Sequence, residues 1–186
     1  DLHILFVGNV SRWHGLDRMI EGIAAYRGSV HLHFHIVGEG DAVDHLKLLK
    51  SSGAPKSDIY FHGFMSGADL DAMFDRCHIA VGSLGIHRKG LAQTSELKAR
   101  EYCARGIPYV IACGDADFPD DFPWILRIAA DDLPVDMENV VTFAHSVFSG
   151  TEPAPAMRKF ALEHLDWKVK IAKLQDFIAK KILLHD

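Results

Sequence analysis

Apolar runs of strand length alternate, over the first two thirds of the chain, with segments whose apolar residues recur at helical spacing. Runs such as LHILFVG (2–8) are continuous, which is typical of strands buried on both faces of a parallel sheet. Repeated strand–helix units predict an α/β fold built on a doubly wound parallel sheet. The pattern predicts strands at 2–8, 31–38, 59–64, 78–84, 107–113 and 125–130, and helices from about Leu16, at 41–49, at 66–76 and from Ser95 to Gly106.

From about residue 134 onward the pattern contains helices only. Periodicity predicts helices at 135–148, 156–164 and 167–183, with a proline-marked break at 151–156. We therefore expect one domain over 1–186, with a Rossmann-like part over about 1–133 and a helical tail over about 134–186. The sequence begins inside a core strand without an initiator methionine, which predicts a domain excised from a longer protein.

The composition fits a globular domain and argues against several classes of function. Hydrophobic residues make up 48% and charged residues 24%, and the net charge of −5 gives no general attraction to nucleic acid or anionic membranes. Three scattered cysteines argue against a disulfide scaffold and for a reducing compartment. No apolar run reaches the length of a membrane span and no signal peptide opens the sequence, so we expect a cytoplasmic protein.

Ligands of open α/β sheets bind beyond the carboxyl ends of the strands, which directs attention to the loops that follow them. The loop GNVSRWHG (8–15) has glycines where backbone amides can approach an anion, and Arg12 and His14 add possible charge. An ordinary tight turn explains the same residues, and the glycine spacing is not that of the dinucleotide fingerprint. The turn GEGD (38–41) is also compatible with a close ligand, but such turns are common.

The segment HRKGLAQTSELKAREYCARGIPYV (87–110) carries the strongest chemical signal. Ser95 is the predicted N-cap, which puts Lys98 in the first helical turn, where the helix dipole disfavours a cation. A residue that opposes the local helix preference without an evident compensating contact indicates a functional site. Two interpretations stay open: Lys98 pairs with Glu101 on the surface, or Lys98 and the helix N-terminus hold a phosphate while Glu101 accepts hydrogen bonds from sugar hydroxyls.

Other charged residues of this segment lie near the junction between the loop and the helix that carries Lys98. Three basic residues precede a glycine and could converge with Lys98: His87, Arg88 and Lys89. Glu96 and Arg100 are spaced as a solvated i,i+4 ion pair with the favourable order of charges.

The twelve histidines raise the question of a metal site. His31, His33 and His35 alternate along one predicted strand, so their side chains share a face and could bind zinc. However, no carboxylate or cysteine partner is obvious, and that face should meet a helix. We interpret them as packed or partly exposed side chains and predict no metal site, with a zinc enzyme kept as an alternative.

Four segments, in this order, resemble the C-terminal donor-binding domain of GT-B glycosyltransferases, and most of all the retaining group 1 type, family four: FVGNVSRWHGLDRMI, LHFHIVGEG, IYFHGF and SELKAREYCARGIPYV. The resemblance covers about residues 2–113 well and extends into the helical tail. It implies a two-domain enzyme that transfers a sugar from a nucleoside diphosphate sugar, with UDP favoured over GDP, to a glycan or lipid-linked acceptor. The acceptor would be bound mainly by an N-terminal domain that is absent here.

The stretch SLGIHRKGL before the helix is similar to enzymes that make capsules and surface polysaccharides. This similarity implies a cytoplasmic enzyme, with peripheral membrane association at the inner face through the missing domain. The final helix is expected to pack toward that domain and to expose apolar residues in its absence: Ile171, Leu174, Phe177 and Ile178.

The resemblance also implies roles for single residues. Glu101 matches the second glutamate of the family's Glu–seven residues–Glu motif, which binds the nucleotide ribose, and Lys98 matches a lysine placed to meet the diphosphate. The first glutamate of that motif falls at Gln93, and Asn9 and His14 replace an arginine and a lysine of the first loop. The expected donor-binding residues are Gly8, Asn9, Arg12, His14, Gly15, Glu39, Gly40, Phe64, Arg88, Gln93, Ser95, Leu97, Lys98 and Glu101.

The implied chemistry needs no cofactor and no essential divalent metal. Lys98 and the backbone amides would neutralise the leaving diphosphate, and Glu101 would position the donor. The isolated domain is expected to bind nucleotide weakly and to lack transferase activity. Two further alternatives stay open: a non-catalytic nucleotide- or partner-binding module, favoured by Asn9 and His14, and a sugar-nucleotide epimerase or phosphorylase on the same scaffold.

Overall fold

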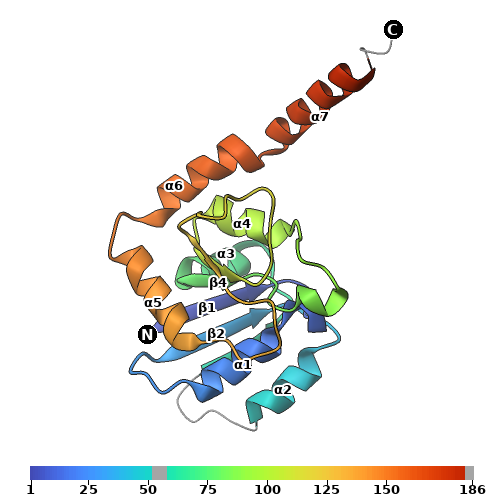
Figure 1. Cartoon of the computed structure of the whole chain (residues 1–186). Helices are drawn as coiled ribbons and strands as arrows, with labels where there is room; N and C mark the ends of the chain where they lie inside the picture. Colours follow the sequence, from blue (N-terminus) through green and yellow to red (C-terminus); the bar gives the residue numbers. More distant parts are fainter. Residues whose placement is uncertain (52–57, 183–186) are drawn as a thin grey trace.

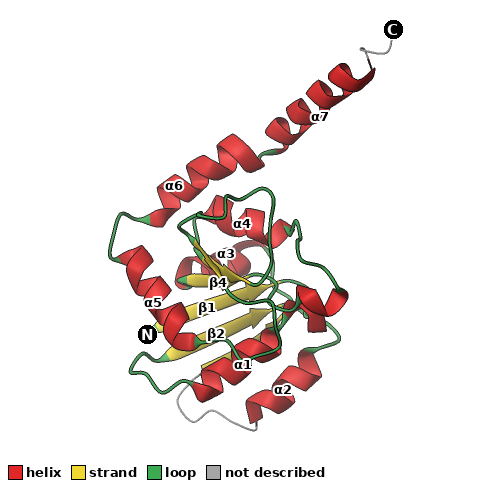
Figure 2. Ribbon diagram, viewed as in Figure 1, coloured by secondary structure: helices red, strands yellow, loops and turns green. Residues whose placement is uncertain are grey.

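A computed structural model of the chain describes residues 1–51 and 58–182 and shows a six-stranded parallel sheet with helices on both faces (Figures 1 and 2). The strand order is β3-β2-β1-β4-β5-β6. Strands β2 and β3 therefore lie on one side of β1, and β4, β5 and β6 lie on the other side. This arrangement confirms the predicted doubly wound α/β fold. The strands are β1 (Leu2–Val7), β2 (Leu32–Val37), β3 (Asp58–Gly63), β4 (Ile79–Val81), β5 (Tyr109–Ile111) and β6 (Ile125–Arg127).

The predicted helices are present, with shifted ends. They are α1 (Leu16–Ala25), α2 (Val43–Ser51), α3 (Gly67–Arg76), α4 (Leu97–Arg105), α5 (Met137–Phe148), α6 (Pro153–Phe160) and α7 (Trp167–Ile182), with short 3-10 turns η1 (Arg12–His14) and η2 (Ile86–Lys89) and a π-helical segment η3 (Ala161–Leu165). The predicted break at 151–156 is wrong in part, because α6 begins inside it at Pro153. A proline fits the first turn of a helix, where its missing N–H would have no partner.

The helices form two layers that explain why the strands are apolar on both faces. Residues of α1, α2 and α5 pack in one core cluster with Ile4 and Phe6 of β1. Residues of α3, α4 and α6 pack in the other with Leu5. Because successive side chains of a strand point to opposite faces, β1 needs apolar residues at consecutive positions.

The start of α4 differs from the prediction. The N-cap is Glu96 rather than Ser95, and its side chain makes no capping hydrogen bond. Ser95 is exposed and lies one residue before the cap. The predicted end of this helix is confirmed: Gly106 has a left-handed φ of 80°, and a Cβ there would lie 2.4 Å from Ala154 Cα of α6.

The helical tail begins on the body of the domain and then leaves it (Figure 1). The Cys103 thiol of α4 donates to the Met157 carbonyl of α6 at 3.3 Å, which holds α6 on α4. Beyond η3, α7 exposes the four expected apolar side chains, Ile171, Leu174, Phe177 and Ile178, and it also exposes Trp167. Within the described residues, no helix combines the length and the apolar character needed to cross a membrane.

Candidate functional site

The loops that follow β1, β2 and β3 are joined by backbone hydrogen bonds at the carboxyl edge of the sheet. Gly8 N–H donates to Val37 at 3.0 Å, and Gly38 N–H donates to Gly63 at 2.7 Å. The strand order reverses between β1 and β4, beside Gly8, and α4 starts near this point. Such a reversal leaves a crevice between diverging loops, which is where α/β sheets bind ligands.

Most of the glycines in these loops are required by backbone packing. A Cβ on Gly38 would lie 1.9 Å from Gly8 O, one on Gly40 would lie 2.2 Å from Val10 O, and one on Gly15 would lie 2.7 Å from Gly85 N. The tight-turn interpretation therefore accounts for these three. Gly8 is different, because its nearest neighbour is the side chain of Lys98, with the Cε atom 3.5 Å from a built Cβ.

Lys98 holds an ammonium group inside this edge. Its side chain is 13% exposed, and Nζ is buried without a hydrogen-bond partner among the described residues. Nζ lies 4.6 Å above the centre of the Phe6 ring and 3.8 Å from Glu96 Oε2. Burial lowers the pKa of Lys98 to about 8, and Glu96 opposes the shift. The Lys98 ammonium therefore has N–H donors available, and an anionic ligand could accept hydrogen bonds from them.

His14 lies close enough to Lys98 for that charge to affect its ionisation. Burial first, and Lys98 second, lower the pKa of His14 to about 3, so the ring is neutral at pH 7. His14 Nδ1 accepts a hydrogen bond from the Ser11 backbone N–H at 3.3 Å. The ring proton must then be on Nε2, which makes His14 a neutral hydrogen-bond donor beside Lys98.

The carboxylate beside Lys98 is Glu96, which the sequence interpretation had placed elsewhere. The predicted solvated Glu96–Arg100 pair is wrong: the Glu96 side chain is 9% exposed, and neither of its carboxylate oxygens has a hydrogen-bond partner among the described residues. Arg100 instead pairs with Asp115 and Asp117 and reaches only the Glu96 backbone carbonyl, at 3.1 Å. No sequence signal distinguished this buried glutamate from an ordinary surface one.

Glu101, three residues after Lys98 on α4, makes its ion pair with Arg105. Its Oε1 accepts from Arg105 Nε at 3.0 Å, and Arg105 also pairs with Asp71 of α3. No ion pair joins Lys98 and Glu101 in the described part of the chain, so the surface-pair interpretation of the two is not what the structure shows. Glu101 borders a cavity of about 580 Å³ together with Ser95 and Leu97.

The basic residues before α4 do not converge on Lys98. Arg88 makes a bidentate ion pair with Asp17 at 2.9 and 2.8 Å and a third contact with Asp132 at 2.6 Å. Its guanidinium therefore joins η2 to α1 and has little capacity left for a phosphate. Lys89 Nζ lies 4.5 Å above the Trp13 ring, and His87 Nε2 lies 3.2 Å from Asp132.

The remaining predicted residues line the rim of this edge. Asn9 is exposed and donates to Ser11 Oγ at 2.9 Å, while the exposed Arg12 borders a cavity of about 600 Å³ between α1 and α2. Phe64 is 77% exposed, although large aromatic side chains are usually covered. The other exposed rim residues are Glu39, Gly40, Gln93, Ser95 and Leu97.

A family model for glycosyl transferases group 1 matches residues 1–148. The chain belongs to this family. The match includes the whole sheet, the Gly8 loop and α4, so the resemblance deduced from the four sequence segments is confirmed at the level of the family. No curated protein matches the chain significantly.

Solved glycosyltransferase structures share the fold of this group 1 chain. The catalytic domain of cholesterol-alpha-glucosyltransferase from Helicobacter pylori is 17% identical, with a TM-score of 0.66 over 87% of this chain and 98% of that one. Anabaena Alr3699/HepE in complex with UDP and glucose is 14% identical, with a TM-score of 0.68 over 97% of this chain and 48% of that one. The pneumococcal O-GlcNAc transferase GtfA in complex with UDP and GlcNAc is 15% identical, with a TM-score of 0.60 over 100% of this chain and 36% of that one. This chain therefore spans about half, or less, of the Anabaena and pneumococcal proteins.

Proposed function

We propose that this group 1 chain is the donor-binding half of a glycosyltransferase that uses a nucleoside diphosphate sugar, with UDP as the nucleotide. The observation that carries the proposal is the buried Lys98 ammonium at the point where the strand order reverses, for which the described part of the chain supplies no hydrogen-bond partner. An ammonium in a poorly solvated site binds a multiply charged anion well, because the attraction between opposite charges is stronger where little water screens it.

The diphosphate lies, in this proposal, between the Gly8 loop and the start of α4. Lys98 Nζ, His14 Nε2–H and the N-terminal amides of α4 then point at its oxygens. The first amides of a helix have no intrahelical partner and carry partial positive charge, so they add to the field of Lys98. The position of Lys98 against the helix dipole becomes favourable once a dianion lies between the two.

The nucleoside extends from the diphosphate toward Phe64 and Glu101. The Glu101 carboxylate can accept hydrogen bonds from both ribose hydroxyls, because each of its oxygens has a lone pair to offer. The exposed Phe64 ring offers an apolar face to the base. Glu39 and Gly40 border the nucleotide from the turn after β2, and Gln93 borders the sugar.

Transfer breaks the bond between the anomeric carbon and the diphosphate oxygen, and that oxygen gains negative charge as the bond breaks. Lys98 and the amides stabilise this charge, and they do so more strongly in the transition state than in the bound donor. A nucleoside diphosphate is a good leaving group, so no general acid is needed. We propose that transfer retains the anomeric configuration and that the sugar is a hexose.

The acceptor, a glycan or a lipid-linked sugar, is bound by a second domain in this proposal. The chain spans 48% of the Anabaena protein, which leaves room for such a domain. The apolar side chains that α7 exposes, from Trp167 to Ile178, offer it a contact surface. The 1–186 chain alone is expected to bind nucleotide and to transfer no sugar.

A nucleotide series tests the proposal. Calorimetric titration of the chain with UDP, GDP, UMP and uridine should show the tightest binding for UDP and a large loss from UDP to UMP, since UMP lacks one of the phosphates that Lys98 attracts. Equal affinities for UDP and uridine would contradict a diphosphate site. Tighter binding of GDP than of UDP would support the diphosphate site but show that guanine, and not uracil, is the preferred base.

A further inference from the structure

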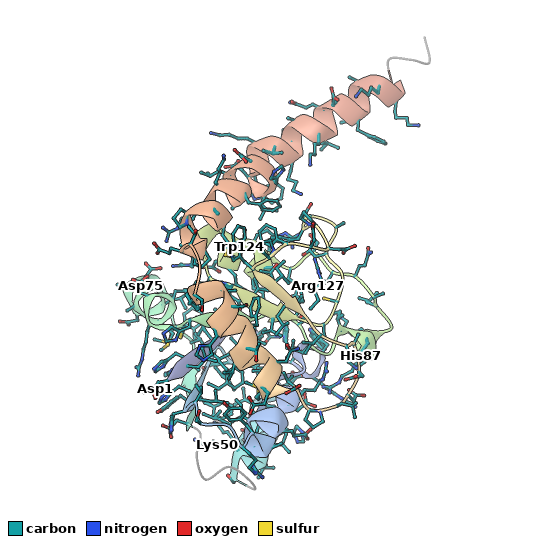
Figure 3. The ribbon with its side chains drawn as sticks, turned by 60° about the vertical axis from the view of Figure 1, so that its left-hand side comes forward. Asp1, Lys50, Asp75, His87, Trp124 and Arg127 are labelled. Atoms are coloured by element: carbon teal, nitrogen blue, oxygen red, sulfur yellow. The ribbon has the colours of Figure 1, made fainter. Side chains whose placement is uncertain are left out.

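A second group of side chains lies at the amino ends of β2 and β3, away from the Lys98 edge. In the view of Figure 3, Asp1, which is next to this group, and His87, which follows β4, lie on opposite sides of the molecule. The register of the sheet pairs His33 of β2 with Asp58 of β3, and His31 lies two residues before His33. Neighbouring parallel strands therefore bring two imidazoles and a carboxylate together.

We propose that His31, His33 and Asp58 bind a divalent transition-metal ion, with Zn²⁺ the best match to this set of ligands. Zinc binds imidazole nitrogen and carboxylate oxygen, and sites with three protein ligands leave a fourth position to water. The exposed side chains of His31 and Asp58 give an ion access from solvent.

The distances between the ligand atoms match a tetrahedral ion. Asp58 Oδ2 lies 3.2 Å from His31 Nε2 and 3.6 Å from His33 Nδ1, and each of the three residues offers one ligand atom within 4.8 Å of the other two. Zinc bonds of about 2.0–2.1 Å place neighbouring ligand atoms about 3.4 Å apart at the corners of a tetrahedron. The two exposed side chains need only small rotations to reach this geometry.

His33 supplies the second observation. Both of its ring nitrogens are buried without a hydrogen-bond partner among the described residues, and buried polar atoms almost always have one. An ion on Nδ1 satisfies the first nitrogen. Asp1 Oδ2 lies 3.6 Å from the second, Nε2, so Asp1 is placed as the carboxylate that typically orients a ligating histidine from behind.

The site differs from the three-histidine set suggested by the sequence. His35 uses both ring nitrogens elsewhere, with His3 at 3.0 Å and His62 at 3.1 Å, so it has no lone pair for an ion. The carboxylate that seemed to be missing comes from β3, and nothing in the sequence shows the register that brings it there. The ion would connect edge strand β3 to β2 and stabilise the fold.

Zinc titration of the chain, without a histidine tag, tests the proposal. We expect one ion per chain by calorimetry, an increase in melting temperature with ZnCl₂, and ¹⁵N chemical-shift changes at His31 Nε2 and His33 Nδ1. His31→Asn and Asp58→Asn should each weaken binding at least about tenfold, and Asp1→Asn by about tenfold. The matched variants His45→Asn and Asp44→Asn, both on the exposed face of α2, should bind zinc like the unmodified chain.

Two results would overturn the site. One is zinc affinity that stays the same in His31→Asn and Asp58→Asn. The other is the absence of any heat, melting shift or ¹⁵N shift at millimolar ZnCl₂.

Discussion

Two regions of one parallel sheet, its carboxyl edge around Lys98 and the histidine network of β1, β2 and β3, use buried basic side chains in opposite ways. At the carboxyl edge, the Lys98 ammonium has no hydrogen-bond partner among residues 1–51 and 58–182, and burial holds its pKa at about 8. Along strands β1, β2 and β3, imidazoles of His3, His35 and His62 are linked to one another, and burial holds the pKa of His3 and of His35 at about 4. The carboxyl edge therefore holds a cation with hydrogen-bond donors to spare, whereas these three histidines form a neutral network in which His35 has a partner on both ring nitrogens.

The difference shows which buried polar groups indicate a ligand. The number of histidines drew attention to this network, but its members are hydrogen-bonded to one another. Lys98 Nζ and both ring nitrogens of His33 are among the buried atoms that have no hydrogen-bond partner within the described residues, and each points to a ligand of opposite character: an anion for the ammonium, a metal ion for the imidazole. A missing partner is therefore a better guide than a cluster of residues of one type.

The largest effect is expected from His35→Ala, which removes the centre of the histidine network. His35 is buried and bonded on both ring nitrogens, so truncation leaves a cavity and two imidazoles without a partner. We expect a loss of about 3–5 kcal/mol in the free energy of unfolding, or roughly 10 °C in melting temperature. UDP affinity of the folded fraction should not change. His45→Ala on α2 serves as the control, and a selective loss of UDP binding in His35→Ala would show that the histidine network and the Lys98 edge are not independent.

The second prediction concerns pH at the carboxyl edge. Lys98 is protonated below its pKa of about 8, and a bound diphosphate raises that pKa. UDP affinity should therefore be constant between about pH 7 and 8, where the phosphates are already ionised. Above pH 8 it should fall by up to about tenfold per unit, since a proton must be taken up on binding. Calorimetry from pH 7 to 9.5 measures this, and a flat profile would remove Lys98 from the site.

The third prediction distinguishes the contribution of the ribose to UDP affinity from that of the phosphates. Glu101→Gln should weaken UDP about tenfold, because a neutral amide accepts weaker hydrogen bonds from hydroxyls than a carboxylate does. The same substitution should leave the affinity for 2′,3′-dideoxy-UDP nearly unchanged. Asp71→Asn, which removes the other carboxylate that pairs with Arg105, controls for the loss of that ion pair. Equal losses for both nucleotides would contradict a ribose contact.

The smallest effect on binding is expected from Arg88→Ala. This guanidinium is occupied by Asp17 and Asp132, so its loss should cost about 1–3 kcal/mol in stability by leaving Asp17 without its partner. UDP affinity should change less than about threefold. A loss of affinity much larger than that, with the fold intact, would return Arg88 to the phosphate site that the sequence had suggested.

Most of the fold could be predicted because it depends on local patterns. Continuous apolar runs indicated the buried strands, and Gly106 marked the end of α4. Lys98 could be found for the same reason, since its conflict with the helix dipole is visible in a single turn. The predicted Ser95 cap was one residue early because Glu96 holds the extended cap conformation without a capping bond.

The partners of individual side chains could not be predicted, because they depend on contacts between distant segments. Burial of Glu96 beside Lys98 and the pairing of Arg88 with Asp17 both follow from how loops pack on the sheet. Asp58 meets His33 only through the register of β2 and β3. Spacing along the chain carries none of this information.

A single calorimetric comparison decides whether Lys98 binds the diphosphate. UDP and uridine are titrated into the unmodified chain, into Lys98→Met and into Lys89→Met, where Lys89 is an exposed lysine that lies over Trp13. We expect Lys98→Met to weaken UDP by about a hundredfold or more while changing uridine little, because an ion pair to a phosphate is lost. Lys89→Met should resemble the unmodified chain. UDP affinity in Lys98→Met within threefold of the unmodified value would show that Lys98 does not bind the diphosphate.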